Sequence, residues 1–301
     1  MLVIKYYAPN RKRTLTEADI SSLEQWKNAQ ENYACARDPR GFLIFLPPDK
    51  IRSYDEYLHG DPYTVAENVT DEFHTRRISM TMELVRMAIG EMPDFRILDI
   101  GCGEGHITAK IHDSFPSAEI SGLDYSVSAI AKASVLYSGI EFIVADAYSP
   151  PYCDEYFDIV VCNNLWEHTP DPLHLLAAIS RTLKSGGHIV ISTPSRYRLR
   201  NILKVVRGRP VELMSHMHVT EYSVGQVIEQ LRYGGFQVVK VLSHPIGREK
   251  GWRELVLAVI GRILRAYLSL IRSHHNLEST VFYLARKTDG PARSATSADG
   301  K

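Results

Sequence analysis

The sequence has few cysteines and no net charge. Its 301 residues include four cysteines, and no two of them form a Cys-x-x-Cys pair. This excludes a disulfide scaffold and a cysteine zinc site, and it favours a reducing cytoplasm. Thirty-five Lys and Arg residues balance thirty-five Asp and Glu residues. The overall charge therefore gives no reason to expect a nucleic-acid partner.

Long apolar segments are also missing. The apolar run at the N-terminus is too short for a signal peptide, and the longest later run, Leu255–Ile271, is interrupted by Arg262 and Arg265. A spanning helix needs about 18 apolar residues, so we expect none and a cytoplasmic location. Apolar residues make up 45% and charged residues 23% of the chain, as in globular proteins that bury a full core.

The chain divides into three regions by pattern. Residues 1–75 mix polar stretches with one apolar run at 41–46, which predicts an irregular leader with one short strand, packed on the core. Residues 76–287 alternate regularly between helix and strand patterns, with an insertion at 245–278. Residues 288–301 are small, polar and charged, which predicts a disordered tail.

Amphipathic helices alternate with short apolar strands in the central region. The predicted helices are Met80–Ile89, Ile107–Phe115, Val127–Tyr137, Pro172–Leu183 and Val224–Tyr233. The predicted strands are Phe95–Ile100, Ile120–Leu123, Ile140–Val144, Phe157–Cys162, His188–Ser192, Phe236–Leu242 and Thr280–Ala285. This alternation predicts an α/β fold whose parallel sheet is covered on both faces.

A glycine-rich loop follows the first of these strands. The segment Asp99–Gly105 has the spacing D-x-G-x-G-x-G, and a predicted helix follows it. A dinucleotide loop would have G-x-G-x-x-G, but His106 occupies the place of its last glycine. Glycines at the carboxyl end of a parallel strand let the backbone approach a ligand closely, although a plain tight turn would use them too.

Carboxylates end three successive strands. Asp99 precedes the glycine loop, Asp124 ends the second strand, and Asp146 follows the third. An acidic residue about twenty positions beyond a glycine loop suits a ribose diol, and one after the third strand can accept from an adenine amino group. A single such Asp is often only a solvated strand end, but three in register favour a binding site.

These residues resemble the class I S-adenosylmethionine-dependent methyltransferases. The matching segments are Ile97–Gly105, Ile120–Ser126, Ala145–Ala147, Phe157–Cys162 and Leu183–Gly187. The resemblance covers residues 76–287 and implies a Rossmann-like, doubly wound, seven-stranded and mostly parallel sheet whose last strand is antiparallel. It implies S-adenosyl-L-methionine as the cofactor and leaves the acceptor open.

The resemblance also implies roles for particular residues. Asp99 would lie near the methionine amino group, Asp124 would bind the ribose, and Asn163 would offer its backbone to the methionine moiety. The other cofactor-binding candidates are Gly101, Cys102, Gly103 and Gly105 in the loop, and Tyr125, Asp146 and Ala147 around the adenine. In the ubiquinone-type O-methyltransferases, a basic residue clamps the cofactor carboxylate, and Arg77 is the candidate here, with Arg76 beside it.

His168 is the candidate catalytic base. It follows the fourth strand, beside the expected methyl position, and its ordinary pKa suits a base at neutral pH. The alternative is that Glu167 and His168 only cap and pack this loop. The ubiquinone-type enzymes carry a further Glu, which can help bind a metal, three residues before this pair. This chain has Asn164 at that position, so we predict no metal site, and a catechol acceptor is disfavoured. His218 is an acceptor-pocket candidate, and His216 a weaker one.

Basic residues gather after the fifth strand. There is no Asp or Glu from 172 to 211, and six basic residues lie in a segment expected to cover the acceptor: Arg196, Arg198, Arg200, Lys204, Arg207 and Arg209. This favours an anionic acceptor, such as a phosphorylated sugar or a lipid-linked glycan, over RNA, which would call for more charge and stacking aromatics.

The insertion contains an amphipathic helix at 252–272 with a wide apolar arc. Three interpretations stay open: burial against residues 1–75, peripheral contact with the inner membrane surface, and a dimer contact.

The sequence thus predicts a methyltransferase acting on a small-molecule or a lipid- or glycan-linked acceptor, at oxygen rather than nitrogen. An aminopropyl-type transferase on the same fold would need acidic polyamine-binding residues, which the basic segment disfavours. A non-catalytic subunit that binds S-adenosylmethionine is the alternative from another class.

Overall fold

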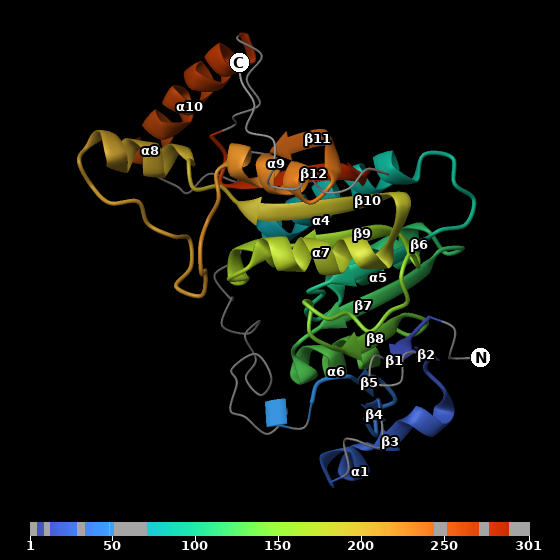
Figure 1. Ribbon diagram of the computed structural model, residues 1–301. Coiled ribbons are helices and arrows are strands. Elements are labelled where there is room, and N and C mark those ends of the chain that lie inside the picture. The colour runs from blue at the N-terminus through green and yellow to red at the C-terminus, as the bar shows by residue number, and fades with distance from the viewer. Residues whose placement is uncertain are drawn as a thin grey trace, which may run out of the picture.

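The protein is built on a ten-stranded mixed sheet (Figure 1). The computed structural model describes residues 5–8, 13–28, 34–47, 49–50, 71–243, 252–270 and 277–288. The strands lie in the order β11-β12-β10-β9-β6-β7-β8-β5-β4-β3. Their bounds are β3 Ile20–Ser22, β4 Cys35–Arg37, β5 Leu43–Ile44, β6 Arg96–Ile100, β7 Glu119–Asp124, β8 Glu141–Val144, β9 Phe157–Asn163, β10 Leu183–Pro194, β11 Phe236–Ser243 and β12 Thr280–Lys287.

The seven predicted strands form one continuous part of this sheet, from β11 to β8. Strands β8, β7, β6, β9 and β10 pair in parallel, and β12 is antiparallel to both β10 and β11. The α/β class and the antiparallel last strand are therefore confirmed. The strand count is larger than expected because residues before 76 extend the sheet.

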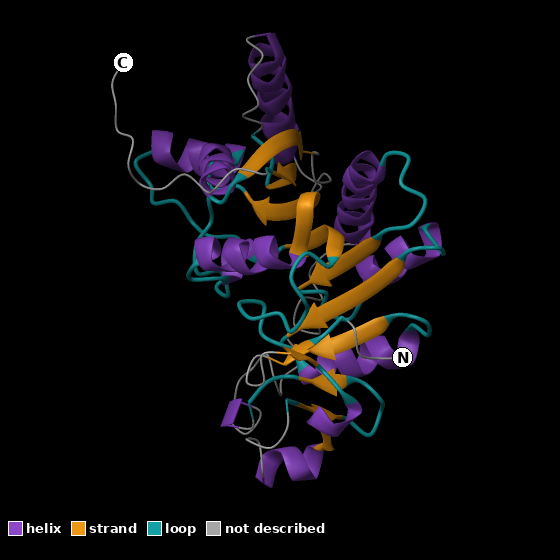
Figure 2. Ribbon diagram, turned by 45° about the vertical axis from the view of Figure 1, so that its right-hand side comes forward, coloured by secondary structure: helices purple, strands orange, loops and turns teal. Residues whose placement is uncertain are grey.

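Helices cover both faces of the sheet (Figure 2). Their bounds are α1 Leu23–Asn28, α4 Asp71–Ile89, α5 His106–Ser114, α6 Val127–Leu136, α7 Pro172–Thr182, α8 Leu199–Val206, α9 Val224–Tyr233 and α10 Trp252–Leu270. Ile97 and Ile159 pack with α4 and α5 on one face, while their neighbours Leu98 and Val160 pack with α7 and α9 on the other. This alternation follows from the two-residue period of a strand.

Three helices start with a capping side chain, close to the helix starts predicted from the sequence. Ser126 accepts a hydrogen bond from the backbone of Ala129 at the start of α6, and Asp171 does the same for α7. Ser223 and Gln226 form a capping box at α9. These side chains satisfy backbone N–H groups that a helix leaves without partners.

The leader is more ordered than the sequence suggested. Its strand β5 lies inside the predicted run and pairs in parallel with β8, and β4 and β3 add two further strands. A separate pair, β1 Tyr7–Ala8 with β2 Arg13–Thr14, lies beside the sheet, where Tyr6 stacks on Tyr152. The expectation of one strand was wrong because strands of two or three residues are too short to show a period.

Two other element boundaries differ from expectation. Helix α4 begins at Asp71 rather than Met80. Strand β10 begins at Leu183 and contains the Lys184–Gly187 turn, with a shift of register before His188. The predicted tail lies outside the described residues from 289 onward.

Helix α10 lies at the opposite end of the sheet from the described part of the leader (Figures 1 and 2). It follows β11, which forms one edge of the sheet, whereas β3 forms the other edge. The described residues of the leader therefore do not bury this helix, and the expectation of burial against residues 1–75 is wrong for them. Among the described helices, none is long and apolar enough to cross a membrane.

Ile44→Ala tests whether the leader is part of the core. Ile44 is 1% exposed and pairs with Val144, so its truncation should leave a cavity and lower the free energy of unfolding by about 2–5 kcal/mol. Urea denaturation measures this change. Val135→Ala on α6, where the side chain is 75% exposed, is the control and should cost under about 1 kcal/mol. Equal effects of the two variants would mean that the leader does not support the sheet.

Candidate active site

The glycine loop lies at the carboxyl edge of the sheet, between β6 and α5. Gly101, Gly103 and Gly105 all have positive φ angles, of 74°, 57° and 79°. These left-handed conformations favour glycine and let the chain turn from the strand into the helix. The amides of Gly101 and Cys102 donate to the Leu123 carbonyl at 2.7 and 3.0 Å, so the loop is fixed to the end of β7.

Close packing leaves no room for side chains at this turn. A Cβ atom on Gly105 would lie 2.8 Å from the Phe142 ring, and one on Gly122 would lie 2.6 Å from it. The glycines therefore keep the backbone of β6, β7 and β8 close together at the place where a ligand approaches.

Asp124 links the glycine loop to the next helix. One carboxylate oxygen accepts from the Gly103 amide and the other from the Ser126 amide, both at 2.8 Å. The side chain is 5% exposed. A carboxylate oxygen can accept more than one hydrogen bond, so this side chain is chemically suited to the hydroxyls of a ribose.

Asp99 is buried beside Asp124. It is 2% exposed, and the Thr108 hydroxyl donates to it at 2.6 Å. Burial raises the pKa of Asp99 to about 6, and the negative charge of Asp124 adds to the rise. The Thr108 hydrogen bond and the positive charge of Arg77 act in the opposite direction. The structure thus brings together Asp99, Asp124 and Arg77, as the sequence predicted.

Asn163 supplies a buried acceptor at the end of β9. Its amide group donates to the Thr81 hydroxyl at 3.1 Å, but its side-chain carbonyl is buried and makes no hydrogen bond. A buried carbonyl without a donor is costly, and a ligand with N–H or O–H groups would satisfy it. Together with the glycine loop and the strand-end carboxylates, this fits a polar cofactor such as S-adenosylmethionine.

The predicted adenine contacts lie at the neighbouring strand ends. The Ala145 amide donates to the Asp124 carbonyl at 3.0 Å, which places the two turns side by side. Asp146 accepts from the Tyr148 amide at 2.9 Å and stays half-buried. Tyr125 and Ala147 are partly buried at the core surface. Their contact with an adenine stays a prediction.

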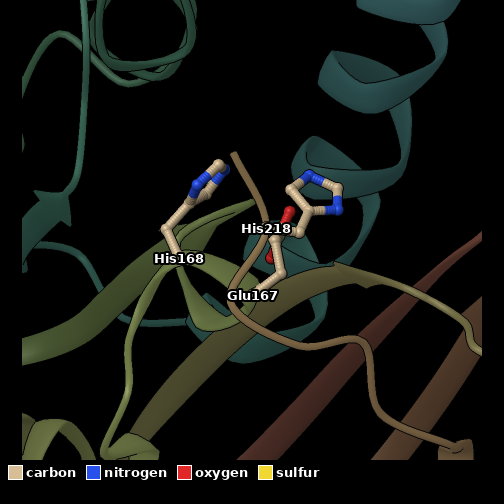
Figure 3. A group of neighbouring side chains, drawn as sticks. All are labelled: Glu167, His168 and His218. Atoms are coloured by element: carbon tan, nitrogen blue, oxygen red, sulfur yellow. The ribbon is translucent and has the colours of Figure 1, made fainter. Parts of the chain in front are cut away.

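Two histidines meet beyond the end of β9. His168 lies in the loop after β9 and His218 in the connection after β10 (Figure 3), with ring centroids 5.0 Å apart. Nδ1 of His168 lies 3.2 Å from the Met217 carbonyl, and Nδ1 of His218 lies 3.0 Å from Glu221. The Met217 carbonyl requires a proton on Nδ1 of His168, so Nε2 of this residue keeps a lone pair when the ring is neutral. Burial and then His218 lower the pKa of His168.

Glu167 holds this loop in place. The carboxylate, 1% exposed, accepts from Asn164 at 3.0 Å and from Thr193 at 3.1 Å, while the backbone carbonyl accepts from Val219. Burial raises the pKa of Glu167. Glu167, His168 and His218 also have ligand atoms within 4.8 Å of one another, which is close enough for a metal ion.

A buried ion pair organises the connection that carries His218. Arg198 pairs with Glu221 and also donates to the carbonyls of Ser195 and Glu212. Burial opposes the charge of Glu221, but hydrogen bonds from His218 and Arg198 outweigh it and lower its pKa. Arg198 is therefore a structural residue, and its assignment to an acceptor-binding group was wrong.

Lys204 also has a partner within the connection. It pairs with Glu212, just beyond the stretch without acidic residues. The sequence missed the partners of Arg198 and Lys204 because each lies eight or more positions away. The predicted His218 is half-buried beside His168, whereas His216 is exposed.

Part of this chain is similar to known methyltransferases. Residues 92–240 match a family model described as a methyltransferase domain. The ubiquinone biosynthesis O-methyltransferase of Burkholderia thailandensis is 27% identical over 174 residues, which are 54% of this chain and 74% of that protein. The ubiquinone/menaquinone biosynthesis C-methyltransferase of Desulfotalea psychrophila is 34% identical over 97 residues, which are 32% of this chain and 39% of that protein.

Solved structures show the same fold. A SAM-dependent methyltransferase from Archaeoglobus fulgidus has a TM-score of 0.50 and 21% identity, covering 75% of this chain and all of that one. The cyclase SpnF also has a TM-score of 0.50 and 21% identity, covering 71% and 82%. The fold and the glycine loop define a Rossmann-like α/β protein. The domain match and the relatives identify residues 92–240 as a class I S-adenosylmethionine-dependent methyltransferase domain.

Asp124→Asn should weaken S-adenosylmethionine binding at least about tenfold. The change keeps the shape of the side chain but removes the charge from its hydrogen bonds to the ribose, and such bonds contribute roughly 1.5–3 kcal/mol. Isothermal titration calorimetry measures the affinity, and circular dichroism checks the fold. Asp113→Asn, on the exposed surface of α5, should bind like the parent. Equal affinities of both variants would remove Asp124 from the site.

Cofactor affinity should also increase from pH 5 to pH 7 through Asp99. With a pKa of about 6, this carboxyl is about one-tenth ionised at pH 5 and about nine-tenths at pH 7. A cationic amino group binds the ionised form, so the dissociation constant should fall about tenfold over this range. In Asp99→Asn this dependence should disappear. A parent whose affinity stays constant from pH 5 to pH 7 would contradict the predicted contact.

Proposed function

We propose that the enzyme transfers the methyl group of S-adenosylmethionine to an oxygen atom of an anionic small-molecule acceptor or an anionic lipid- or glycan-linked acceptor. The main support is His168, which has a lone pair on Nε2 at the carboxyl edge of the sheet. A hydroxyl acceptor must lose its proton as the new bond forms, and a neutral imidazole can take it.

In this proposal the cofactor would be held by residues from three strand ends, β6, β7 and β9, and from α4. Asp124 would accept from the ribose hydroxyls, and the glycine loop would lie against the methionine moiety. Asp99 and Asn163 would bind the methionine amino group, and Arg77 would bind its carboxylate. When bound, S-adenosylmethionine would supply a methyl group carried on a sulfonium sulfur. The remainder of the cofactor would leave as a neutral thioether.

His168 then acts as the general base. Its Nδ1–H donates to the Met217 carbonyl, which fixes the ring, and Nε2 takes the hydroxyl proton of the acceptor. Because the pKa of His168 is below its ordinary value, the ring is neutral at pH 7 and ready to accept. Alignment of the hydroxyl oxygen with the methyl group would lower the barrier by more than the base does, by roughly 7–11 kcal/mol.

An anionic acceptor is supported by the charges around α8. Arg207 and Arg209 are exposed at its end, while Arg198 and Lys204 are engaged with Glu221 and Glu212. The relatives include both O- and C-methyltransferases by name, so the choice of oxygen rests on the base at His168.

His168→Ala should lower turnover about 10²-fold or more with cofactor affinity unchanged. The rate of S-adenosylhomocysteine formation is measured with a panel of hydroxyl acceptors, including catechols, sugar phosphates and undecaprenyl-linked glycans. His216→Ala, in the same connection but exposed, is the matched control and should keep the parent rate. Cofactor binding without turnover on the whole panel would favour the non-catalytic alternative.

A chelation series separates the base from a metal site. EDTA should leave turnover unchanged if His168 is a base. Loss of activity in EDTA, with recovery on addition of a divalent cation, would instead assign Glu167, His168 and His218 to a metal. A turnover rate that His168→Ala does not change would return this residue to loop packing.

A further inference from the structure

Helix α10 carries an apolar stripe that the described residues of the protein leave exposed. Val259, Ile263, Tyr267 and Leu270 are 47%, 64%, 57% and 82% exposed. Their spacing of four, four and three residues places them within about 80° of the helix circumference. On another side of α10, Ile260, Leu264 and Leu268 are only half-exposed. The apolar arc predicted from the sequence therefore has one sheltered part and one open part.

Positive charge accompanies this stripe. Helix α10 contains three arginines and one glutamate, and the exposed Arg262 flanks the stripe. Helix α8 ends with the exposed Val205 and Val206, 56% and 77% exposed, followed by Arg207 and Arg209. The Leu199 amide at the start of α8 donates to the Leu277 carbonyl at 3.0 Å, which ties α8 to the chain returning from α10.

Both helices leave the sheet at the edge that carries the active site. Ser243 at the end of β11 pairs with Val281, which pairs with Thr193 at the end of β10. The chain thus leaves β11 level with the carboxyl end of β10, the edge where Asp99, Asp124 and His168 lie. Figure 1 shows α10 projecting from the body at the end of the molecule where α8 also lies.

We propose that α10 and the end of α8 dock the enzyme on an anionic phospholipid surface. The stripe of Val259, Ile263, Tyr267 and Leu270 would enter the boundary between headgroups and acyl chains, while the flanking arginines reach the lipid phosphates. The excess of arginines favours an anionic lipid surface over a second copy of the chain as the partner, because two copies joined here would bring like charges together. The active-site edge then faces the membrane, where a lipid-linked acceptor is available.

The inference does not depend on the chemistry of the acceptor. If docking fails, S-adenosylmethionine binding and turnover on a water-soluble acceptor are unaffected. If the proposed function fails, vesicle binding remains.

Vesicle flotation with the full chain tests the docking. The parent should float with phosphatidylcholine vesicles containing 30% phosphatidylglycerol, and binding should weaken at least tenfold in pure phosphatidylcholine or at high salt. Ile263→Glu and Leu270→Glu should each reduce partitioning at least tenfold. Arg262→Glu should reduce it more than fivefold, since one basic residue contributes roughly fivefold and the reversed charge adds repulsion.

Matched controls separate this effect from a general change of surface. Leu136→Glu replaces a 61% exposed leucine on α6, and Arg86→Glu reverses an exposed charge on α4, and both should float like the parent. The proposal is overturned if the parent does not float, or if Ile263→Glu floats like Leu136→Glu. It is also overturned if the parent is a dimer that Ile263→Glu dissociates while flotation is absent.

Discussion

A single carboxylate, Asp124, joins the first two turns at the carboxyl edge of the sheet. It accepts from Gly103 in the loop after β6 and from Ser126 at the start of α6. Both turns are thereby held to β7, and the crowded glycines beside Phe142 leave no room for a Cβ atom. The predicted cofactor site is thus already ordered in the protein, which would lower the cost of ordering it on binding.

The acceptor side depends on a second buried interaction, between Arg198 and Glu221. This ion pair folds the connection after β10 back onto the loop after β9, so that His218 meets His168. Loss of one partner would leave a buried charge, which is strongly destabilising. Arg198 therefore supports the connection that carries His218, whereas Arg207 and Arg209 are exposed.

The sequence predicted the central sheet and the place of the glycine loop well because long apolar strands and a glycine loop carry strong local signals. It missed β3 and β4, whose three residues each are too few to show a period. It also missed the ion pairs of Arg198 and Lys204, since side chains distant in sequence come together only in the folded chain. The same limit applied to α10. Its apolar arc was visible, but which part of the arc is sheltered is decided only in the folded chain.

Asp99, Asp124 and His168 lie on the edge of the sheet from which α8 and α10 also leave, so an acceptor held at a membrane would meet the methyl group there. A crystal structure of the complex with S-adenosylhomocysteine tests this arrangement. We expect ribose hydroxyls within hydrogen-bond distance of Asp124 and the sulfur atom facing His168. A cofactor bound away from the glycine loop, or with its sulfur turned from His168, would contradict it.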